Sequence, residues 1–523
     1  MNRRILASIL LAATFALSDA PSKAADIYIA QTATGNGTGT DASNCKSYTF
    51  FTTASNWNGT TWNASTGVGT ICATATKDTI RDTIHLVGTI GNQLLWPYAT
   101  GTGVAGLRIY FEPNARLSAP TWPGGAIKWE SAGYAKNNVI IDGGTNGVIE
   151  CTANGTLLAN HVNSCGISFI SASHLTIKNL TISNIYIRVN DASNDQVDGG
   201  SAIYGSTGDG PYTDFTVQDC VIHDANIGIN APYTNGSARY SFLRNQISNI
   251  NWGIGSGSAS TNATMDNWLA DGNNIHDFAN WDAPSGYEAF HHNGIFLWGS
   301  NGTNAFRSWT ISNNTFGPNF GTRATGGVYL SSYGMTGAGL IAKNVFIGST
   351  SNGLLTVGTG TGSVVRVYNN TFVCNSTANT CINIGGSSAS AMSVDVKNNI
   401  SFGGAFINGN MVGSVTLTSN YNLAFGFSSG YPGVISWSTT TNGNAVSWAN
   451  WQSTFGQDTN SVYNKNPLLD GNCKLQAGSP AIGAGTSLLS SYTSRSDLDL
   501  GAYAYSSVSA LAAPSNAIVI ATQ

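Results

Sequence analysis

A short motif of glycine followed by apolar residues recurs through the middle of this chain. Successive copies lie 25, 41, 33, 26 and 28 residues apart, and they are centred on Gly228, Gly253, Gly294, Gly327, Gly353 and Cys381. A drifting period of this size, made of short strands without a helical pattern, is typical of a β-solenoid. Because a solenoid stacks its strands, residues far apart in sequence become vertical neighbours, and each can be assigned to a face.

A second strand type alternates with the first, and nearly every copy ends in Asn or Asp. This row comprises Asn179, Asp219, Asn245, Asn274, Asn314, Asn344, Asn370 and Asn399. Alternating apolar and polar residues in these strands predict one inward and one outward face. Asn tolerates the left-handed conformation of a tight corner, and stacked amides can hydrogen-bond along the axis. We interpret the row as structural, with sugar binding as the alternative.

The composition indicates an ordered chain that does not bind nucleic acid. Only 9% of the 523 residues are charged and the net charge is −4, whereas 41% are hydrophobic. Disordered chains lack such apolar content, and the basic runs of nucleic-acid-binding proteins are missing from this sequence. We therefore expect no nucleic-acid partner. We also expect a monomer with one elongated core, since the core of a solenoid grows along a single direction.

The first 24 residues have the pattern of an export signal. Arg3 and Arg4 precede a mostly apolar run over residues 5–17, and small residues lead up to Ala24. The run is too short for a membrane span, and no later segment is apolar over a sufficient length. We expect the mature protein to begin near Ala25 and to be secreted or periplasmic.

Eight cysteines suit an oxidising compartment. The candidate disulfide pairs are Cys374 with Cys381, Cys151 with Cys165, and Cys45 with Cys72. Cys220 and Cys473 remain as candidate buried thiols. Spacing alone does not decide the connectivity.

Three features resemble the right-handed parallel β-helix proteins of the pectate lyase-like superfamily. They are the start Ile27-Tyr-Ile-Ala-Gln-Thr-Ala-Thr-Gly-Asn-Gly-Thr, the Asn-ended strands, and the closing motifs Asn466-Pro-Leu-Leu-Asp and Asp499-Leu-Gly-Ala-Tyr. The resemblance covers about residues 26–505. It implies a right-handed coil and lyase or hydrolase chemistry on a polysaccharide. We predict an all-β fold, a single-stranded right-handed parallel β-helix with an irregular N-terminal cap.

The expected organisation has five parts. They are a signal peptide (1–24), an N-terminal segment and cap (25–105), the parallel β-helix (106–430), a C-terminal closing segment (431–505) and a tail (506–523).

Alignment of the glycine motif predicts a strip of outward side chains. Ile229, Ile254, Ile295, Val328, Leu354 and Ile382 would point inward. Because side chains alternate along a strand, the residues after them and three before them would point outward. The predicted substrate-binding residues are Tyr204, Asn226, Asn230, Asn251, Trp281, Phe296, Trp298 and Tyr329. Aromatic faces beside amides suit a sugar chain; the alternative is that these side chains pack beneath loops.

An insertion over residues 277–292 concentrates groups suited to catalysis. Its candidate catalytic residues are His291, His292, Asp282 and Glu288. A histidine can act as a general base near neutral pH. His276 precedes the insertion but repeats His223, since both occur in Ile-His-Asp, and this repetition favours a structural role for the two.

A second insertion, over residues 190–198, contains three aspartates. Asp191, Asp195 and Asp198 could hold Ca²⁺ through their oxygen atoms, which makes Ca²⁺ the one cofactor considered. The spacing does not match an EF-hand, so a solvated acidic loop is the alternative.

These features favour an exported protein that binds a polysaccharide along the β-helix and cleaves it. In a lyase, His291 or His292 would remove a proton beside a uronic carboxylate, and Arg323 would neutralise the developing charge, with Arg239 or Lys343 as substitutes. In a hydrolase, Asp282 and Glu288 would act as the carboxylate pair. The catalytic motifs of polygalacturonases, mannuronan epimerases and pectate lyases do not map onto this chain. The alternative is therefore a non-catalytic extracellular glycan-binding or structural β-helix.

Overall fold

The computed structural model describes most of the chain from residue 25 onward. The described residues are 25–57, 82–96, 104–129, 136–153, 155–156, 162–170, 172–185, 187–188, 200–206, 211–279, 292–299, 304–321, 324–331, 335–358, 360, 362–375, 379–385, 391–410, 412–426, 435–439, 444–490, 492 and 497–506. The expected signal peptide and residues 507–523 of the expected tail lie outside these ranges.

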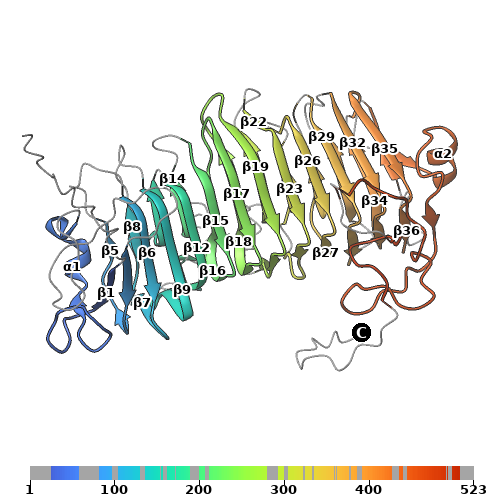
Figure 1. Cartoon of the computed structure of the whole chain (residues 1–523). Coiled ribbons are helices and arrows are strands. Elements are labelled where there is room, and N and C mark those ends of the chain that lie inside the picture. Colours follow the sequence, from blue (N-terminus) through green and yellow to red (C-terminus); the bar gives the residue numbers. More distant parts are fainter. Residues whose placement is uncertain are drawn as a thin grey trace, which may run out of the picture.

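The chain forms a right-handed parallel β-helix, as predicted. Its coils stack into a rod, with α1 (Thr49–Thr52) near the N-terminal end and α2 (Trp448–Ser453) at the C-terminal end (Figure 1). Each complete coil contributes to three faces, called here the first, second and third sheet. Because several long strands bend from one face to the next, 37 of the described strands form one continuous sheet, while β10 and β13 pair separately.

The first sheet faces the viewer in Figure 1. In stacking order it comprises β1 (Ala25–Ala30), β3 (Asp82–Leu86), β6 (Val104–Phe111), β9 (Lys136–Cys151), β12 (Ala172–Ser183), β15 (Thr213–Gln218), β17 (Ser237–Leu243), β19 (Thr264–Asp271), β23 (Ser308–Ser312), β26 (Ala338–Ala342), β29 (Val364–Tyr368), β32 (Met392–Lys397) and β35 (Val415–Asn420). Since β1 and β3 already pair here, the coil stack takes in strands of the segment that we expected to serve as a cap.

The second sheet is built from shorter strands. It comprises β4 (Thr89–Ile90), β7 (Arg116–Ala119), the ends of β9 and β12, the starts of β16 (Val221–Asn230) and β18 (Gln246–Ser258), then β20 (Asn274–His276), β24 (Thr315–Phe316), β27 (Val345–Gly348), β30 (Thr371–Cys374), β33 (Ile400–Phe402), β36 (Leu423–Phe425) and β39 (Val462–Tyr463).

The third sheet contains the glycine motif. It comprises β5 (Leu94–Leu95), β8 (Ile127–Trp129), β11 (Cys165–Ile170), β14 (Ser201–Ser206), the ends of β16 and β18, then β21 (Asn293–Gly299), β25 (Gly326–Leu330), β28 (Leu355–Val357), β31 (Thr380–Gly385), β34 (Ala405–Asn410) and β37 (Ile435–Trp437), which pairs antiparallel with β38 (Asn444–Val446). The remaining elements are β2 (Lys46–Ser47), η1 (Ala54–Asn56), β10 (Gly155–Thr156), β13 (Ile187–Arg188) and β22 (Ala305–Phe306).

An aliphatic column runs along the inside of the third sheet. Its members are in register and are all fully buried: Ile229, Ile254, Ile295, Val328, Leu355, Ile382, Ile407 and Ile435. This confirms the predicted inward stack, with one correction. Leu355 rather than Leu354 pairs with Val328, although both leucines are buried.

The glycine of the motif is required by the close approach of successive coils. A Cβ atom on Gly253 would lie 2.4 Å from the Gly294 carbonyl oxygen and 2.6 Å from Cγ2 of Ile275. On Gly228 and Gly294, an added Cβ atom would lie 2.6 and 2.4 Å from the carbonyl oxygens of Gly253 and Gly327 in the next coil. A larger side chain at this column would therefore force the coils apart.

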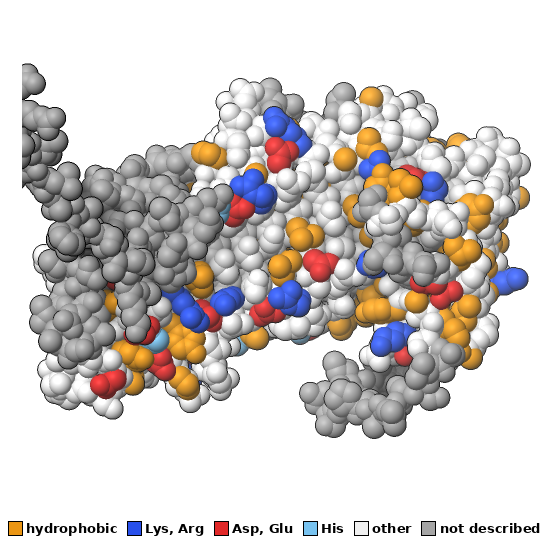
Figure 2. All heavy atoms as spheres, in the orientation of Figure 1, with side chains coloured by type: hydrophobic (Ala, Val, Ile, Leu, Met, Phe, Trp, Pro, Cys, Tyr) orange, Lys and Arg blue, Asp and Glu red, His pale blue; other side chains and the backbone are white. Residues whose placement is uncertain are grey.

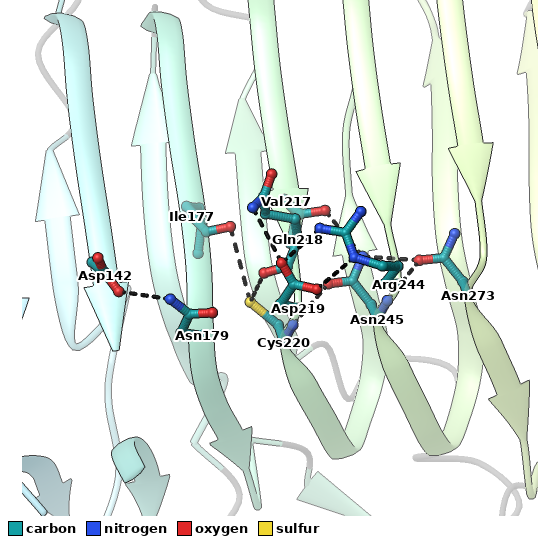
Figure 3. A network of polar contacts seen from close by, with 10 residues as sticks. All are labelled: Asp142, Ile177, Asn179, Val217, Gln218, Asp219, Cys220, Arg244, Asn245 and Asn273. Atoms are coloured by element: carbon teal, nitrogen blue, oxygen red, sulfur yellow. Dashed lines mark hydrogen bonds and ion pairs between the residues drawn. The ribbon is translucent and has the colours of Figure 1, made fainter. Parts of the chain in front are cut away.

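A ladder of buried asparagine amides joins the coils at the corner between the first and second sheets. It contains Asn245, Asn273, Asn314, Asn344, Asn370, Asn399 and Asn422. Each Nδ2 donates to the Oδ1 of the next amide at 2.9–3.1 Å. Each Nδ2 also donates to a backbone carbonyl of the preceding coil, as Asn245 does to Val217 at 3.0 Å (Figure 3). The predicted axial hydrogen bonding is confirmed.

Two details of the predicted Asn row are wrong. Asn273 rather than Asn274 occupies the ladder. Asn179 and Asp219 lie one position earlier, in a separate column that has positive φ. That column also contains Arg244, Asn313, Lys343, Asn369, Asn398 and Tyr421, with φ between 52° and 59°. The left-handed corner and the buried amide therefore belong to consecutive residues, because the corner turns the following side chain into the interior.

The ladder ends at the buried carboxylate of Asp458, beside α2. Asn422 Nδ2 donates to its Oδ1 at 3.0 Å, while Trp451 Nε1 donates to its Oδ2 at 2.9 Å. Hydroxyl groups of Ser419 and Ser461 supply two further hydrogen bonds, at 2.7 and 2.6 Å. A carboxylate has only acceptors, so it suits the point at which every neighbouring group donates.

The closing segment folds back over the outside of the second sheet. Asn398 Nδ2 donates to the Thr486 carbonyl at 2.8 Å, and the Ala502 amide donates to Thr371 Oγ1 at 2.9 Å. Among the residues that the structure describes, neither helix has the length and hydrophobicity of a membrane span.

Among the described cysteines, Cys374 and Cys381 lie close together, whereas Cys220 and Cys473 are buried at separate places. The Sγ atoms of Cys374 and Cys381 lie 3.2 Å apart in the interior. Burial raises the pKa of the Cys220 thiol to about 12 and that of Cys473 to about 11, which fits the role of buried thiols expected for them. The expected partner of Cys45, Cys72, lies outside the described residues.

Substitution of Asn344 by Ala should destabilise the stack. The change removes the acceptor of the Asn314 backbone amide and the donor to the Ile311 carbonyl, both buried. We expect the free energy of unfolding to fall by about 3 kcal/mol, as for buried polar groups left without partners. Urea denaturation followed by circular dichroism measures this, with the exposed Thr418→Ala as the control. Equal midpoints for the two variants would contradict a stabilising role for the ladder.

Cys374 and Cys381 should form a disulfide in protein exported to an oxidising compartment. Their sulfur atoms are near enough to bond with a small adjustment, whereas Cys220 lies elsewhere in the core. Mass spectrometry of unreduced, alkylated protein should show these two cysteines linked and Cys220 alkylated after unfolding. Alkylation of both Cys374 and Cys381 without a reductant would refute the bond.

Candidate functional site

From Tyr204 onward, one residue per coil of the third sheet occupies the same register position along the rod; the register continues toward the N-terminus through Ser168 and Lys128, and Thr356 is buried in this row. This outer strip consists of Tyr204, Asn230, Gly255, Phe296, Tyr329, Thr356, Asn383, Asn408 and Ser436, paired in register from coil to coil. Adjacent members are about 4.8 Å apart, the spacing of neighbouring strands. The sequence-predicted residues Tyr204, Asn230, Phe296 and Tyr329 therefore fall in one continuous row. Thr356 takes the place that the alignment had given to Leu355.

Four half-buried aromatic side chains form a cluster in the middle of the strip. The ring centroid of Phe296 is 4.9 Å from that of Trp252, 5.5 Å from that of Tyr329 and 6.4 Å from that of Trp298. Sequence reasoning identified three of these residues and missed Trp252. Its position directly before the motif glycine Gly253, in register with Ile227, was the available signal.

Trp298 is held against the backbone of the preceding coil. A Cβ atom on Gly257, its register partner, would lie 1.9 Å from Cε2 of the indole. The ring therefore occupies the space that any larger residue at position 257 would need. This contact fixes the orientation of an aromatic surface beside the strip.

A cavity of about 380 Å³ opens at the end of the strip nearer the N-terminus. It is lined by Gly124, Asn163, Cys165, Ser168, Gly200, Ser201, Tyr204, Asn226, Ile227 and Asn230. Tyr204 is the most accessible aromatic residue here, with 37% of its surface exposed. The volume lies within the range of pockets that hold small ligands.

Three residues expected to be exposed are buried instead: Asn226, Asn251 and His292, at 7%, 2% and 0% exposure. They form a second polar ladder, in which Asn251 Nδ2 donates to Asn226 Oδ1 at 3.0 Å and His292 Nδ1 contacts Asn251 Oδ1 at 2.8 Å. Strict alternation predicted exposure, but the chain bends at the corner before the motif glycine, so alternation fails there. Among the three, Asn226 alone lines the cavity.

The amide of Asn251 selects the protonation of His292. Because its Oδ1 can only accept, Nδ1 of His292 must carry the hydrogen. Any acid–base role of His292 would therefore use Nε2. His292 is fully buried and contacts Asn251, so it can position the Asn251 amide. It also stays a candidate base.

Most of the candidate catalytic and metal-binding residues lie outside the described ranges, as does Trp281, a predicted substrate-binding residue. The candidate catalytic and metal-binding residues concerned are Asp282, Glu288, His291, Arg323, Asp191, Asp195 and Asp198. The alternative cations lie on the first sheet, Arg239 within β17 and Lys343 directly after β26, and Arg239 pairs with Asp214 at 2.5 Å. Within the described part of the chain, no group of three or more His, Cys, Asp or Glu could hold a metal ion.

His223 and His276 repeat each other in the structure as in the sequence. Nδ1 of His223 lies 2.5 Å from Asp224, and Nδ1 of His276 lies 2.7 Å from Asp277. Both aspartates have positive φ at the corner after the second sheet. The repetition fits the structural role expected for these pairs.

Comparison with known proteins yields distant structural neighbours. No protein-family model matches the chain, and no curated protein matches it. Among solved structures, it is similar to the pectate lyase Pel9A (14% identity, 93% of this chain and 98% of that chain, TM-score 0.44). It is also similar to the GH136 lacto-N-biosidase from Eubacterium ramulus (12% identity, 84% of this chain and 68% of that chain, TM-score 0.40). A third neighbour is PfbA, a surface adhesin of Streptococcus pneumoniae (11% identity, 69% of this chain and 84% of that chain, TM-score 0.36). The likeness concerns the β-helix fold alone.

Substitution of Gly257 by Ala should displace the Trp298 ring without unfolding the coils. The new methyl group would occupy the space of the indole. We expect a changed near-ultraviolet circular dichroism spectrum with an unchanged far-ultraviolet one. Trp298→Phe defines the signal that comes from Trp298, and Gly471→Ala, where a Cβ meets nothing within 4 Å, is the control. A near-ultraviolet spectrum identical to that of the control would contradict the proposed contact.

Proposed function

We propose that this chain is an exported protein that binds a polysaccharide lengthwise along the outer strip of the third sheet. The alignment of Tyr204, Asn230, Phe296 and Tyr329, one from each of four coils, is the observation that carries the proposal. A sugar polymer also repeats along its length, so a periodic row of binding groups suits it better than it suits a compact ligand.

The chemistry of the row matches the two kinds of surface on a sugar ring. Aromatic side chains pack against the apolar faces of the rings, and amides exchange hydrogen bonds with the hydroxyl edges. Asn408 Nδ2 donates to Asn383 Oδ1 at 2.8 Å, so this part of the strip is already ordered before any ligand binds. Ordered side chains lower the entropic cost of binding.

The cavity beside Tyr204 gives the strip a defined end. Asn226 and Asn230 line it together with the aromatic ring of Tyr204. A concave site with an aromatic wall and a few polar groups is a typical small-ligand pocket. We assign one sugar unit, or the end of the chain, to this cavity.

Cleavage of the bound chain is a second candidate function. Its support is positional, since residues 280–291, with Asp282, Glu288 and His291, lead directly into β21, the strand that carries Phe296 and Trp298. New reducing ends after incubation with a bound polysaccharide would indicate a hydrolase, and an unsaturated product would indicate a lyase. Binding without either product would leave the strip as a binding surface only.

Substitution of Tyr204 or Tyr329 by Ala should weaken polysaccharide binding. Each change removes an aromatic surface of the strip, and we expect a loss of about 1–2 kcal/mol, or about five- to thirtyfold in Kd. Isothermal titration calorimetry with the best ligand from a polysaccharide panel measures this.

Tyr463→Ala is the matched control for this prediction. Tyr463 is 40% exposed, close to the 37% of Tyr204, but it stacks on Trp448 at the C-terminal end, away from the third sheet. A loss of affinity in Tyr463→Ala equal to that in Tyr204→Ala would remove the support for the strip.

A further inference from the structure

The described part of the outer strip contains no charged side chain. Its members are Tyr, Asn, Gly, Phe, Tyr, Thr, Asn, Asn and Ser in coil order. The residues that line the adjoining cavity are also uncharged at neutral pH. Lys128 is the nearest described cation in register, two coils before Tyr204, and its ammonium group lies beside Gly124 at the cavity rim.

Charged residues of the same coils lie on the first sheet. Figure 2 shows basic and acidic side chains in pairs across that face. The pairs include Arg239 with Asp214, Arg244 with Asp219, Arg307 with Asp266, and Lys397 with Asp395. The coils can therefore accommodate outward charges at regular intervals. The third sheet differs from the first in the kind of side chain it presents.

A polyuronate would need a different strip. It carries a carboxylate on every sugar, and burying these charges against protein requires cations or dense hydrogen-bond donors along the path. Arg is the side chain best suited to this because its guanidinium binds a carboxylate through two donors. A single Lys at one end cannot neutralise carboxylates that repeat along nine coils.

The segments that lead into the strip are acidic in sequence. Residues 190–198 precede β14 and contain three aspartates, and residues 280–291 precede β21 and contain Asp282 and Glu288. Arg323 is the basic counterpart in sequence, since it lies three residues before β25, so the charge of the strip itself carries the argument.

We infer that the outer strip takes a neutral polysaccharide and rejects polyuronates. The inference rests on the proposed function and narrows it to a class of ligand. It also disfavours the lyase mechanism considered from the sequence, because that chemistry requires a uronic carboxylate beside the proton removed. Recognition would come from ring stacking on the aromatic cluster and from hydroxyl contacts with Asn230, Asn383 and Asn408.

The test uses the full chain and ligand pairs that differ only in charge. Polygalacturonate and alginate are each compared with their carboxyl-reduced forms, beside a panel of neutral glucans, mannans and galactans, by affinity electrophoresis at low and high salt. We expect a neutral polymer to bind with a Kd at least about tenfold lower than that of any polyuronate. The Kd should be nearly independent of salt, because uncharged contacts are not screened.

Three outcomes would overturn the inference, and they separate it from the proposed function. Polyuronate binding that weakens in Tyr329→Ala would keep the strip as the site but reject the neutral ligand. Polyuronate binding that is unchanged in Tyr204→Ala and Tyr329→Ala would reject both the ligand class and the site. No binding to any member of the panel would reject the proposed function and the inference with it.

Discussion

The asparagine ladder at the corner of the first and second sheets is the interaction on which the register of the coils depends. Each amide accepts at Oδ1 from the coil before it and donates from Nδ2 to the coil after it. Both the oxygen and the nitrogen of these buried amides therefore have hydrogen-bond partners. Hydrogen bonds in such a chain strengthen one another in a low-dielectric interior. By holding each coil one strand spacing above the last, the ladder also sets the spacing of the side chains on the third sheet.

Sequence periodicity was sufficient to predict the strands but not the corners. Inside a strand, strict alternation placed Ile229 inside and Asn230 outside, and the structure confirms both. At the bend before the motif glycine alternation fails, so Asn251 and His292 are buried although exposure was expected. The slip between Leu354 and Leu355 has a similar origin, because the loop before β28 changes the count of residues between the glycine and the strand. Spacing alone does not encode the geometry of a turn.

The two long faces of the rod carry different kinds of side chain. The first sheet bears ion pairs between neighbouring coils, whereas the third bears an uncharged row of aromatic and amide side chains. Glycine residues make room for the aromatic side chains on the third sheet. Gly257 leaves room for the Trp298 indole, and Gly255 leaves the space beside the Trp252 ring. The proposed binding surface is thus shaped by residues that have no side chain as well as by those that would touch a ligand.

The direction of the ladder bears on how proteins of this kind can change in length. Every rung from Asn245 to Asn422 has the same polarity, so a duplicated or deleted coil would leave matching donors and acceptors at the new junction. The last rung differs from the others, because the Asp458 carboxylate accepts hydrogen bonds and donates none. Evolution could therefore lengthen or shorten the rod between its two ends by whole coils, and with it the surface that we propose as the binding strip, while Asp458 remains the terminal acceptor.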